Sequence, residues 1–335
     1  MKAIVQHEYG PPSVLALTNV DEPAVDDDSV IVRVHAASVN PADWHFMRGV
    51  PHIARVSFGL RQPKHRILGC DLAGRVEAVG ANVITVQPGD EVFGSTFEHG
   101  LGAFAELCAC PSEALLERKP ANLSFEQAAA VPLAGMTALQ GLRDHGRIEP
   151  GHRVLIVGAS GGVGTFAVQI AKALGAEVTG VCGTSNVEMV RSLGADHVID
   201  HTREDFTAER GRYDLILQVA GTHAPSACRR ALTRTGTLVL ISGDSEGRWL
   251  GPFDRYVKAR LLSPLVSQRL VGFTMSPDSQ DLRVLNQLIE AGTVRPVIDR
   301  THSLEEVPEA IAHLELGHAR GKVVIRCVET SGARE

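Results

Sequence analysis

A glycine-rich turn between an apolar run and a helical pattern constrains this chain more than any other feature. Residues 154–157 read as a buried strand, residues 158–164 have the sequence GASGGVG, and residues 166–172 have helical periodicity. Glycines at such a turn let the backbone bend tightly and approach a pyrophosphate, and the N-terminus of the following helix offers free N–H groups. The flanking strand and helix make the pattern more specific than glycine spacing alone. We therefore expect a dinucleotide site rather than a turn without a ligand.

The residues that follow repeat the strand-and-helix unit. A helix is expected over 187–193, and further strands are expected at residues 178–182, 197–199, 214–219, 236–241 and 270–273. Strands that alternate with helical segments pair in parallel through right-handed crossovers. This half of the chain is therefore predicted to form a Rossmann domain, an α/β fold with a doubly wound parallel sheet.

The N-terminal part has a different texture, with short apolar runs separated by Gly and Pro, which is typical of a small β-barrel. A helical pattern over 124–142 leads into the nucleotide half, and a helix over 304–316 precedes a last strand over 322–326. We predict a barrel domain made of residues 1–120 and 295–335. The Rossmann domain, residues 121–294, is inserted into it.

Composition narrows the classes of function. The net charge of −6 argues against nucleic-acid binding, which needs a basic excess. No apolar run reaches the roughly 18–20 residues of a membrane span, so no stable membrane insertion is expected. Residues 1–7 begin in strand-like alternation, without the pattern of a signal peptide, and the six cysteines form no C-x-x-C pair. Free thiols in a reducing cytoplasm fit these features, and a cytoplasmic protein is expected.

Four segments together resemble the medium-chain dehydrogenase/reductase superfamily, in its zinc-free quinone oxidoreductase-like branch. They are residues 36–44 (AASVNPADW), 68–74 (LGCDLAG), 158–164 and 317–322 (GHARGK). The resemblance covers nearly the whole chain. It implies a GroES-like catalytic domain, a nucleotide domain, and a cleft between them where NAD(P)H meets its substrate. By analogy it also implies a homodimer joined through sheet edges.

The resemblance implies three groups of cofactor-binding residues. The glycine-rich turn, with Gly158, Ser160, Gly161, Gly162, Val163 and Gly164, is expected at the pyrophosphate. Four residues are expected near the nicotinamide half, namely Thr137, Leu240, Ser242 and Phe273. The returning C-terminal segment is expected to close over the cofactor with His318, Ala319 and Arg320. Leu240 and Phe273 are also compatible with ordinary core positions, and Arg320 with a solvated surface charge.

The end of the second Rossmann strand bears on the choice of cofactor. NAD-preferring folds place an acid there to bind the ribose hydroxyls. This chain has Gly183, Thr184, Ser185 and Asn186 instead, with His201 expected nearby. NADPH is therefore favoured. Relatives often have Ser, a basic residue and Tyr around these positions, so the affinity is expected to be modest and to rise as His201 protonates.

The zinc alcohol dehydrogenases of the superfamily supply catalytic ligands that this chain lacks. They have Cys where this chain has Asn40, His where it has Cys70, and a second Cys near Leu133. A catalytic zinc needs three protein ligands with thiolate, imidazole or carboxylate groups. Asp71 and the histidines are left as other possible ligands, but no spacing supports them. We expect no metal.

Without a Lewis acid, hydride transfer to an electrophilic carbon is favoured over oxidation of an alcohol. The prediction is an NADPH-dependent reductase of quinones or of the C=C bond of α,β-unsaturated carbonyl compounds, with a small lipophilic substrate. Asn40 is expected to donate to the developing oxyanion, and Asp43 to orient Asn40 or the ribose or to relay a proton. The alternative for both is a structural role in a turn.

Two other functions and one unassigned segment remain open. A catalytically weak NADP(H)-binding sensor, scaffold or crystallin-like protein is one alternative, and an NADP-linked alcohol dehydrogenase is the other. Residues 247–269 mix bulky apolar with basic side chains. They are expected to form a cap over the substrate, an interface with a second subunit or a membrane surface, or an amphipathic helix packed on the sheet.

Overall fold

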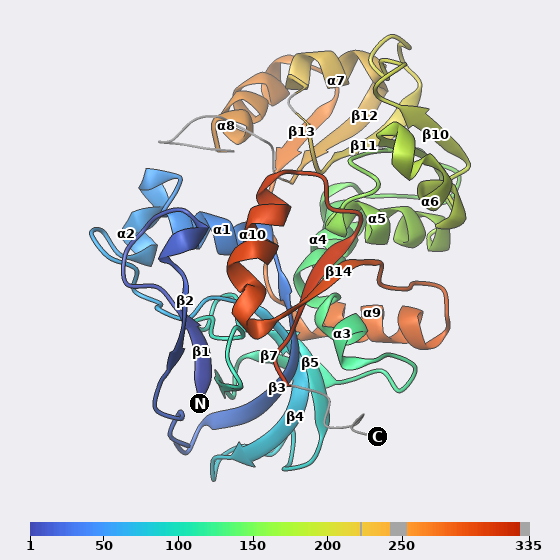
Figure 1. Ribbon diagram of the computed structural model, residues 1–335. Helices are drawn as coiled ribbons and strands as arrows, with labels where there is room; N and C mark the ends of the chain where they lie inside the picture. Colours follow the sequence, from blue (N-terminus) through green and yellow to red (C-terminus); the bar gives the residue numbers. More distant parts are fainter. Residues whose placement is uncertain (222, 242–252, 329–335) are drawn as a thin grey trace.

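The computed structural model describes residues 1–221, 223–241 and 253–328, and two large sheets dominate them (Figure 1). The six-stranded sheet is parallel throughout, in the order β10-β9-β8-β11-β12-β13. This order is that of a doubly wound Rossmann fold, and it reverses between β8 and β11. The prediction of the fold class is confirmed. The strands are β8 (Arg153–Val157), β9 (Glu177–Cys182), β10 (His197–Asp200), β11 (Tyr213–Gln218), β12 (Leu232–Leu240) and β13 (Arg269–Gly272).

Two apolar cores cover the two faces of this sheet. On β8, Val154 and Ile156 belong to one core, and Leu155 and Val157 belong to the other. Successive strand residues point to opposite faces, so a strand buried on both sides becomes a continuous apolar run. The first core is shared with α4 (Pro132–Gln140), α5 (Gly162–Ala173), α6 (Val187–Ser192) and α9 (Ser279–Glu290), and the second with α7 (Pro225–Ala231) and α8 (Phe253–Leu262).

The second large sheet belongs to the GroES-like part and joins the two ends of the chain. Its order is β14-β15-β3-β4-β5-β7, and β6 also pairs with β3. Because β15 pairs antiparallel with β3, the C-terminal segment completes a sheet begun by the N-terminal half. The strands are β3 (Ser29–Val39), β4 (Asp71–Val79), β5 (Glu91–Ser95), β6 (Leu107–Pro111), β7 (Leu115–Arg118), β14 (Ile298–Ser303) and β15 (Lys322–Arg326).

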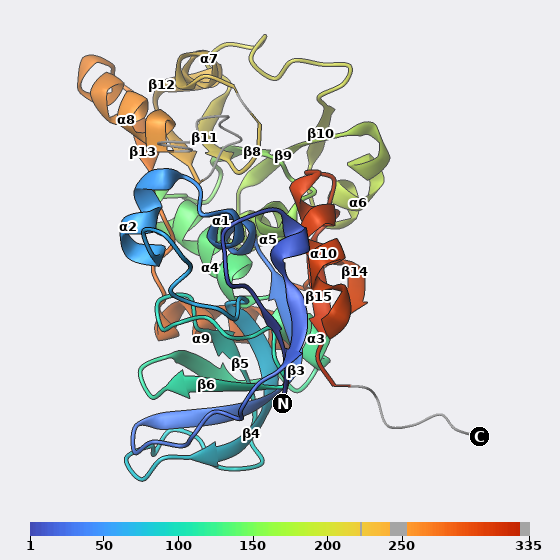
Figure 2. The same ribbon diagram turned by 60° about the vertical axis from the view of Figure 1, so that its left-hand side comes forward.

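Helices α1 (Pro41–Arg48) and α10 (Val307–Glu315) pack against this sheet, and Met47 and Ile311 are buried in its core. Strands β1 (Lys2–Val5) and β2 (Ala16–Asn19) form a separate antiparallel pair, and α2 (Arg55–Phe58) lies beside α1 (Figure 2). The domain boundaries near residues 121 and 294 stay predictions.

Several expected elements differ from those observed. The helical pattern over 124–142 forms two α-helices: α3 (Phe125–Ala129) ends before α4, because Pro132 has no N–H to donate and its ring favours the first turn of a new helix. Helices α1, α7 and α9 were not expected. For α9 a pattern was present, since Leu282, Leu285 and Ile289 recur at helical spacing and are buried.

Part of the unassigned segment 247–269 forms α8. Residues 247–252 of that segment lie outside the described part of the chain. Within α8, Arg255 donates to the carbonyls of Gly221 (3.1 Å) and His223 (2.7 Å), and Tyr256 Oη donates to the carbonyl of Phe273 (3.0 Å). The opposite face leaves Leu261 exposed. One face of α8 therefore packs on the Rossmann half, but its exposed face keeps the apolar side chains of Val257 and Leu261, so the cap, the interface and the packed amphipathic helix all stay predictions.

Candidate active site

A cleft of about 810 Å³ lies at the carboxyl ends of β8 and β9, where an open α/β sheet binds its ligand. Most of the predicted cofactor residues line it. They are Gly158, Ser160, Gly161, Gly183, Thr184, Ser185, Asn186, His201, His318, Ala319 and Arg320. The structure thus brings together the glycine-rich turn, the end of β9 and the C-terminal segment.

The glycines of the turn are required for different physical reasons. Gly158 has φ +87°, and a Cβ there would lie 2.7 Å from the Ala220 side chain. A Cβ on Gly164 would lie 2.0 Å from the Gly158 carbonyl oxygen, so only glycine fits. Gly161 differs, because its Cβ would face open space with one atom within 4 Å, at 3.6 Å. Gly161 therefore leaves room on the cleft side for a ligand.

The N-terminus of α5 opens at the same place. Its first turn contains no acidic residue, and its N-cap, Gly161, has no side chain to cap the free N–H groups. Unsatisfied N–H groups and the helix dipole favour an anion at this position. The cradle fits the pyrophosphate of a dinucleotide.

The far end of the cleft is polar: Thr184 to Asn186, which follow β9, are neutral, and Glu204 and Asp205 also line this end. Thr184 Oγ1 donates to Asp200 Oδ2 (2.6 Å), and Asn186 Nδ2 donates to Ser160 Oγ (3.2 Å). The Asn186 Oδ1 atom is buried and has no hydrogen-bond partner, which suits a ligand hydroxyl or amino group. Sequence reasoning missed Thr202, Glu204, Asp205, Phe206 and His223 in the lining, although the first four follow β10 and His223 follows β11, which was a usable signal.

Other predicted cofactor residues do not line this cleft. Thr137 lies on α4, where its hydroxyl donates to the Leu133 carbonyl (2.6 Å). Leu240 is buried at the end of β12, and Phe273 stacks on His145 with ring centroids 4.1 Å apart. Ser242 lies outside the described residues. Gly162, Val163 and Gly164 belong to the first turn of α5.

The predicted catalytic residues lie in a buried polar network at the start of α1. Asn40 is 1% exposed and Asp43 is 0% exposed. Asp43 Oδ2 accepts the backbone N–H of Asn40 (2.7 Å), and its Oδ1 accepts that of Gly69 (3.1 Å). Because Pro41 starts the helix and Asp43 sits in its first turn, the carboxylate also faces the positive end of the helix dipole. Asp43 thereby fixes the backbone of Asn40.

The amide of Asn40 is fully engaged in this network. Its Nδ2 donates to Asp71 Oδ2 (2.9 Å) and the Ser38 carbonyl (3.3 Å), and its Oδ1 accepts from Lys322 Nζ. Asp71 also accepts the backbone N–H of Leu133, at 3.2 Å, at the start of α4. Sequence reasoning gave no role in this network to Lys322. A lysine at the start of a buried apolar strand was the available signal.

Burial governs the titration of the network. It raises the pKa of Asp43 to about 7, although the backbone N–H of Asn40 lowers it. Burial likewise raises the pKa of Asp71, and the Lys322 ammonium opposes that shift. The pKa of Lys322 is lowered by burial, and Asp71 opposes this change. Two carboxyl groups and one amine therefore share a small volume without water.

The residue types here do not resemble a metal centre. Within residues 1–221, 223–241 and 253–328, no group of three or more His, Cys, Asp or Glu side chains is placed to hold a metal ion. Cys70 is buried, its pKa is raised well above the ordinary range by burial, and it receives only a 3.5 Å contact from Asn40 Nδ2.

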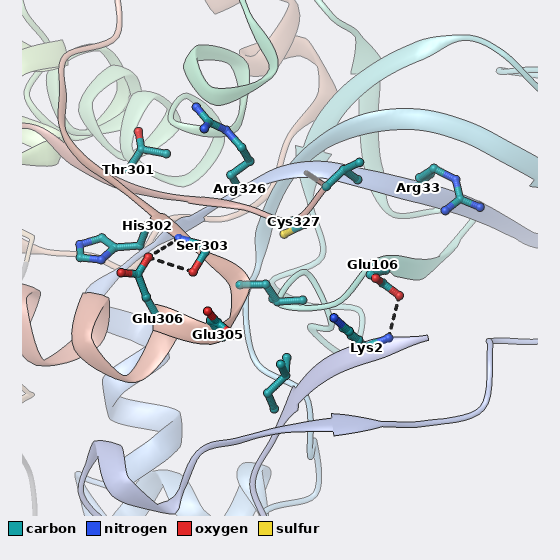
Figure 3. A pocket seen from close by; sticks show the side chains of 13 residues that line it. Lys2, Arg33, Glu106, Thr301, His302, Ser303, Glu305, Glu306, Arg326 and Cys327 are labelled. Carbon is teal, nitrogen blue, oxygen red and sulfur yellow. Dashed lines mark hydrogen bonds between the residues drawn. The ribbon is translucent and has the colours of Figure 1, made fainter. Parts of the chain in front are cut away.

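A second cavity, of about 880 Å³, lies elsewhere (Figure 3). It is lined by β1, β14 and the end of β15, and it contains none of the predicted site residues. Two of its cations are already paired, Arg33 with Glu77 (2.9 Å) and Arg326 with Glu126 (3.1 Å). The β8–β9 cleft therefore stays the candidate cofactor site.

Comparison with known proteins identifies the family. Residues 26–121 match the alcohol dehydrogenase GroES-like domain, and residues 193–325 match the zinc-binding dehydrogenase family. The chain belongs to the medium-chain dehydrogenase/reductase superfamily, in its quinone oxidoreductase-like branch.

Individual relatives agree with this placement. The chain is 33% identical to 2-methylene-furan-3-one reductase of Solanum lycopersicum, over 97% of this chain and 79% of that protein. It is 36% identical to the mitochondrial NAD(P)H oxidoreductase RTN4IP1 of Mus musculus, over 98% of this chain and 89% of the relative. The solved quinone oxidoreductase of Coxiella burnetii superposes with a TM-score of 0.86 at 30% identity, covering 98% of this chain and 99% of that one. These relatives support an oxidoreductase role with a nicotinamide cofactor.

In the part of the chain that the structure describes, no helix is both long and apolar enough to cross a membrane.

Proposed function

We propose that this protein is a zinc-independent, NADPH-dependent reductase of quinones or of the C=C bond of α,β-unsaturated carbonyl compounds. The observation that carries the proposal is that Lys322 connects the phosphate-binding turn to a buried network around Asn40, which offers amide and carboxyl groups and, among the described residues, no set of zinc ligands. The tomato and Coxiella relatives, named for reduction of a methylene-furanone and of quinone, support the same substrate class.

The nicotinamide cofactor supplies the hydride, and the chain supplies position and charge. The α5 N-terminus and Gly161 hold the phosphates, and the C-terminal segment covers the cleft. The proposed contact between Asn40 and the substrate oxygen requires Nδ2 to release a partner, for which the longer bond to the Ser38 carbonyl (3.3 Å) is the natural candidate. Asp43 holds the Asn40 backbone during this exchange.

A preference for NADPH over NADH is part of the proposal. Its evidence is the set of residues at the end of β9. The residues there, Thr184 to Asn186, are neutral, and His201 lies beside them in the lining. Glu204 and Asp205 also line this end, and their charge opposes a 2′-phosphate. We therefore expect a modest preference for NADPH over NADH.

A homodimer joined through sheet edges is also proposed. Strands β10 and β13 end the six-stranded sheet, and an edge strand offers unpaired backbone groups to a second copy. Sedimentation at several concentrations tests this, since a dimer has twice the 35.8 kDa of one chain.

The test of function is oxidation of NADPH, with NADH in parallel, against quinones, linear and cyclic enones and simple alcohols, with and without a metal chelator. Turnover of a quinone or enone that chelator leaves unchanged is the expected result. Alcohol oxidation lost on chelation contradicts the proposal.

A further inference from the structure

Lys322 is the first residue of β15, and it lies between the phosphate-binding turn and the buried network around Asn40. The residue before it, Gly321, donates its N–H to the Ser160 carbonyl (2.9 Å) and pairs with Gly161 in an isolated bridge. Gly321 has φ +95°, and a Cβ there would lie 2.3 Å from the Val297 carbonyl oxygen, so this close approach requires glycine. The backbone of the C-terminal segment is thus fixed to the turn that would hold the phosphates.

The aliphatic part of Lys322 continues this contact. A Cβ built on Gly162 would lie 3.0 Å from Lys322 Cδ, which means that the lysine stem runs directly over the first turn of α5. The backbone N–H of Lys322 donates to the Val297 carbonyl (2.8 Å). The side chain therefore starts against the nucleotide-binding element.

Its ammonium ends in the catalytic domain. Lys322 Nζ donates to the Val39 carbonyl (3.2 Å) and to Asn40 Oδ1, and it lies 3.8 Å from Asp71 Oδ2. Lys322 is 3% exposed, so these contacts are made away from water, where a charge-assisted hydrogen bond is strong. Because the ammonium donates to Asn40 Oδ1, the amide is oriented with Nδ2 toward Asp71 and Ser38.

We propose that Lys322 is a positioning residue that couples dinucleotide binding to the catalytic domain, holding the Asn40 amide in register with the phosphate-binding turn. The inference rests on the proposed function for its kinetic consequences, whereas the coupling between the two parts of the chain is a physical property that binding alone reveals. One side chain touches both parts, so movement of the turn on binding a dinucleotide is transmitted to Asn40.

Lys322→Met keeps the stem over Gly162 and removes the charge, while Lys322→Arg keeps a cation. Lys119→Met is the matched control, because Lys119 is half-buried and also donates to backbone carbonyls, those of Leu123 (2.7 Å) and Pro120 (3.2 Å), but far along the chain from this network. Lys322→Met/Asp71→Asn removes the carboxylate that the single variant leaves unpaired, and it replaces the single variant if that one does not fold.

Two measurements separate coupling from a merely structural role. The first is the NADP⁺ dissociation constant by calorimetry, beside kcat and KM for a quinone or enone. The second is the fluorescence of Trp44, next to Asp43, as NADP⁺ is added in a Trp249→Phe background, which leaves one tryptophan in the chain.

We expect Lys322→Met to bind NADP⁺ within about threefold of the parent while kcat falls at least about tenfold, since small displacements of a positioned group cost rate. Lys322→Arg recovers most of kcat, Lys119→Met retains it, and the Trp44 response to NADP⁺ disappears only in the Lys322→Met chains. An unchanged kcat in Lys322→Met, an equal loss in Lys119→Met, or a parent chain whose Trp44 ignores bound NADP⁺ overturns the proposal. If the parent reduces no quinone or enone, the proposed function fails, and the Trp44 response still decides the coupling.

Discussion

At the scale of single residues, burial determines the pKa of the Asp43 carboxyl more than its residue type does. The carboxyl accepts two backbone N–H groups, which favours its charged form, but it is 0% exposed, which disfavours charge. Burial is the larger effect and raises the pKa to about 7. An aspartate in an exposed turn would titrate about three pH units lower.

This shift predicts a pH-dependent stability that Asp43→Asn removes. Between about pH 4 and pH 7 the unfolded chain has lost the proton and the folded protein keeps it, so the free energy of unfolding falls as the pH rises. One proton contributes up to about 1.4 kcal/mol per pH unit in this window and nothing further above it. Urea unfolding of both proteins from pH 4 to pH 8 measures the difference. Parallel curves would contradict the raised pKa.

At the scale of elements, the turn from β8 into α5 combines glycines that the fold needs with one that the ligand needs. Gly164 fits because its hydrogen lies against the Gly158 carbonyl, whereas Gly161 borders the cleft. Of these two glycines, three positions apart, Gly164 is therefore needed for packing of the turn and Gly161 for binding of the ligand.

Alanine substitutions separate these two purposes. Gly164→Ala is expected to lower the free energy of unfolding by about 2 kcal/mol or more, because its Cβ would lie 2.0 Å from a backbone oxygen. Gly161→Ala is expected to change stability by less than about 1 kcal/mol and to weaken NADP⁺ binding at least about tenfold. Denaturant unfolding and calorimetry measure the two effects. Equal stability of the two variants would show that the turn is not packed as described.

At the scale of the whole molecule, one apolar core joins the two sheets. Ala36, Ala73 and Phe93 of the GroES-like sheet belong to the same buried cluster as Ile156 and Phe166 of the Rossmann half. Domains that share a core lose contacts together when either opens. The two parts are therefore more closely joined than domains connected by a linker.

A single thermal transition is the expected consequence. In the Trp249→Phe background, far-ultraviolet circular dichroism, which follows both sheets, and Trp44 fluorescence, which follows the GroES-like part, are expected to give coincident midpoints. Saturating NADP⁺ is expected to raise both midpoints equally, because the bound state is coupled to folding of the whole chain. Two separated transitions would refute the shared core as a cooperative unit.

The sequence alone determined the Rossmann sheet and the place of its glycine-rich turn, because a strand buried on both faces and the turn that follows are local patterns of apolar and glycine residues. It also determined that positions 40 and 133 lack zinc ligands, since ligand type is a property of the residue. Helix ends were less predictable, since Pro132 divided a pattern that looked continuous, and α9 was missed although Leu282, Leu285 and Ile289 recur at helical spacing.

The tertiary structure decided the chemistry around Asn40. Lys322 bonds an amide 282 positions away in the chain, and no local periodicity encodes such a pairing. It exists because β15 pairs with β3 and brings the C-terminal segment from the phosphate-binding turn to the start of α1. The pKa of Asp43 has the same origin, since the loss of water around a carboxyl depends on what the whole fold packs against it.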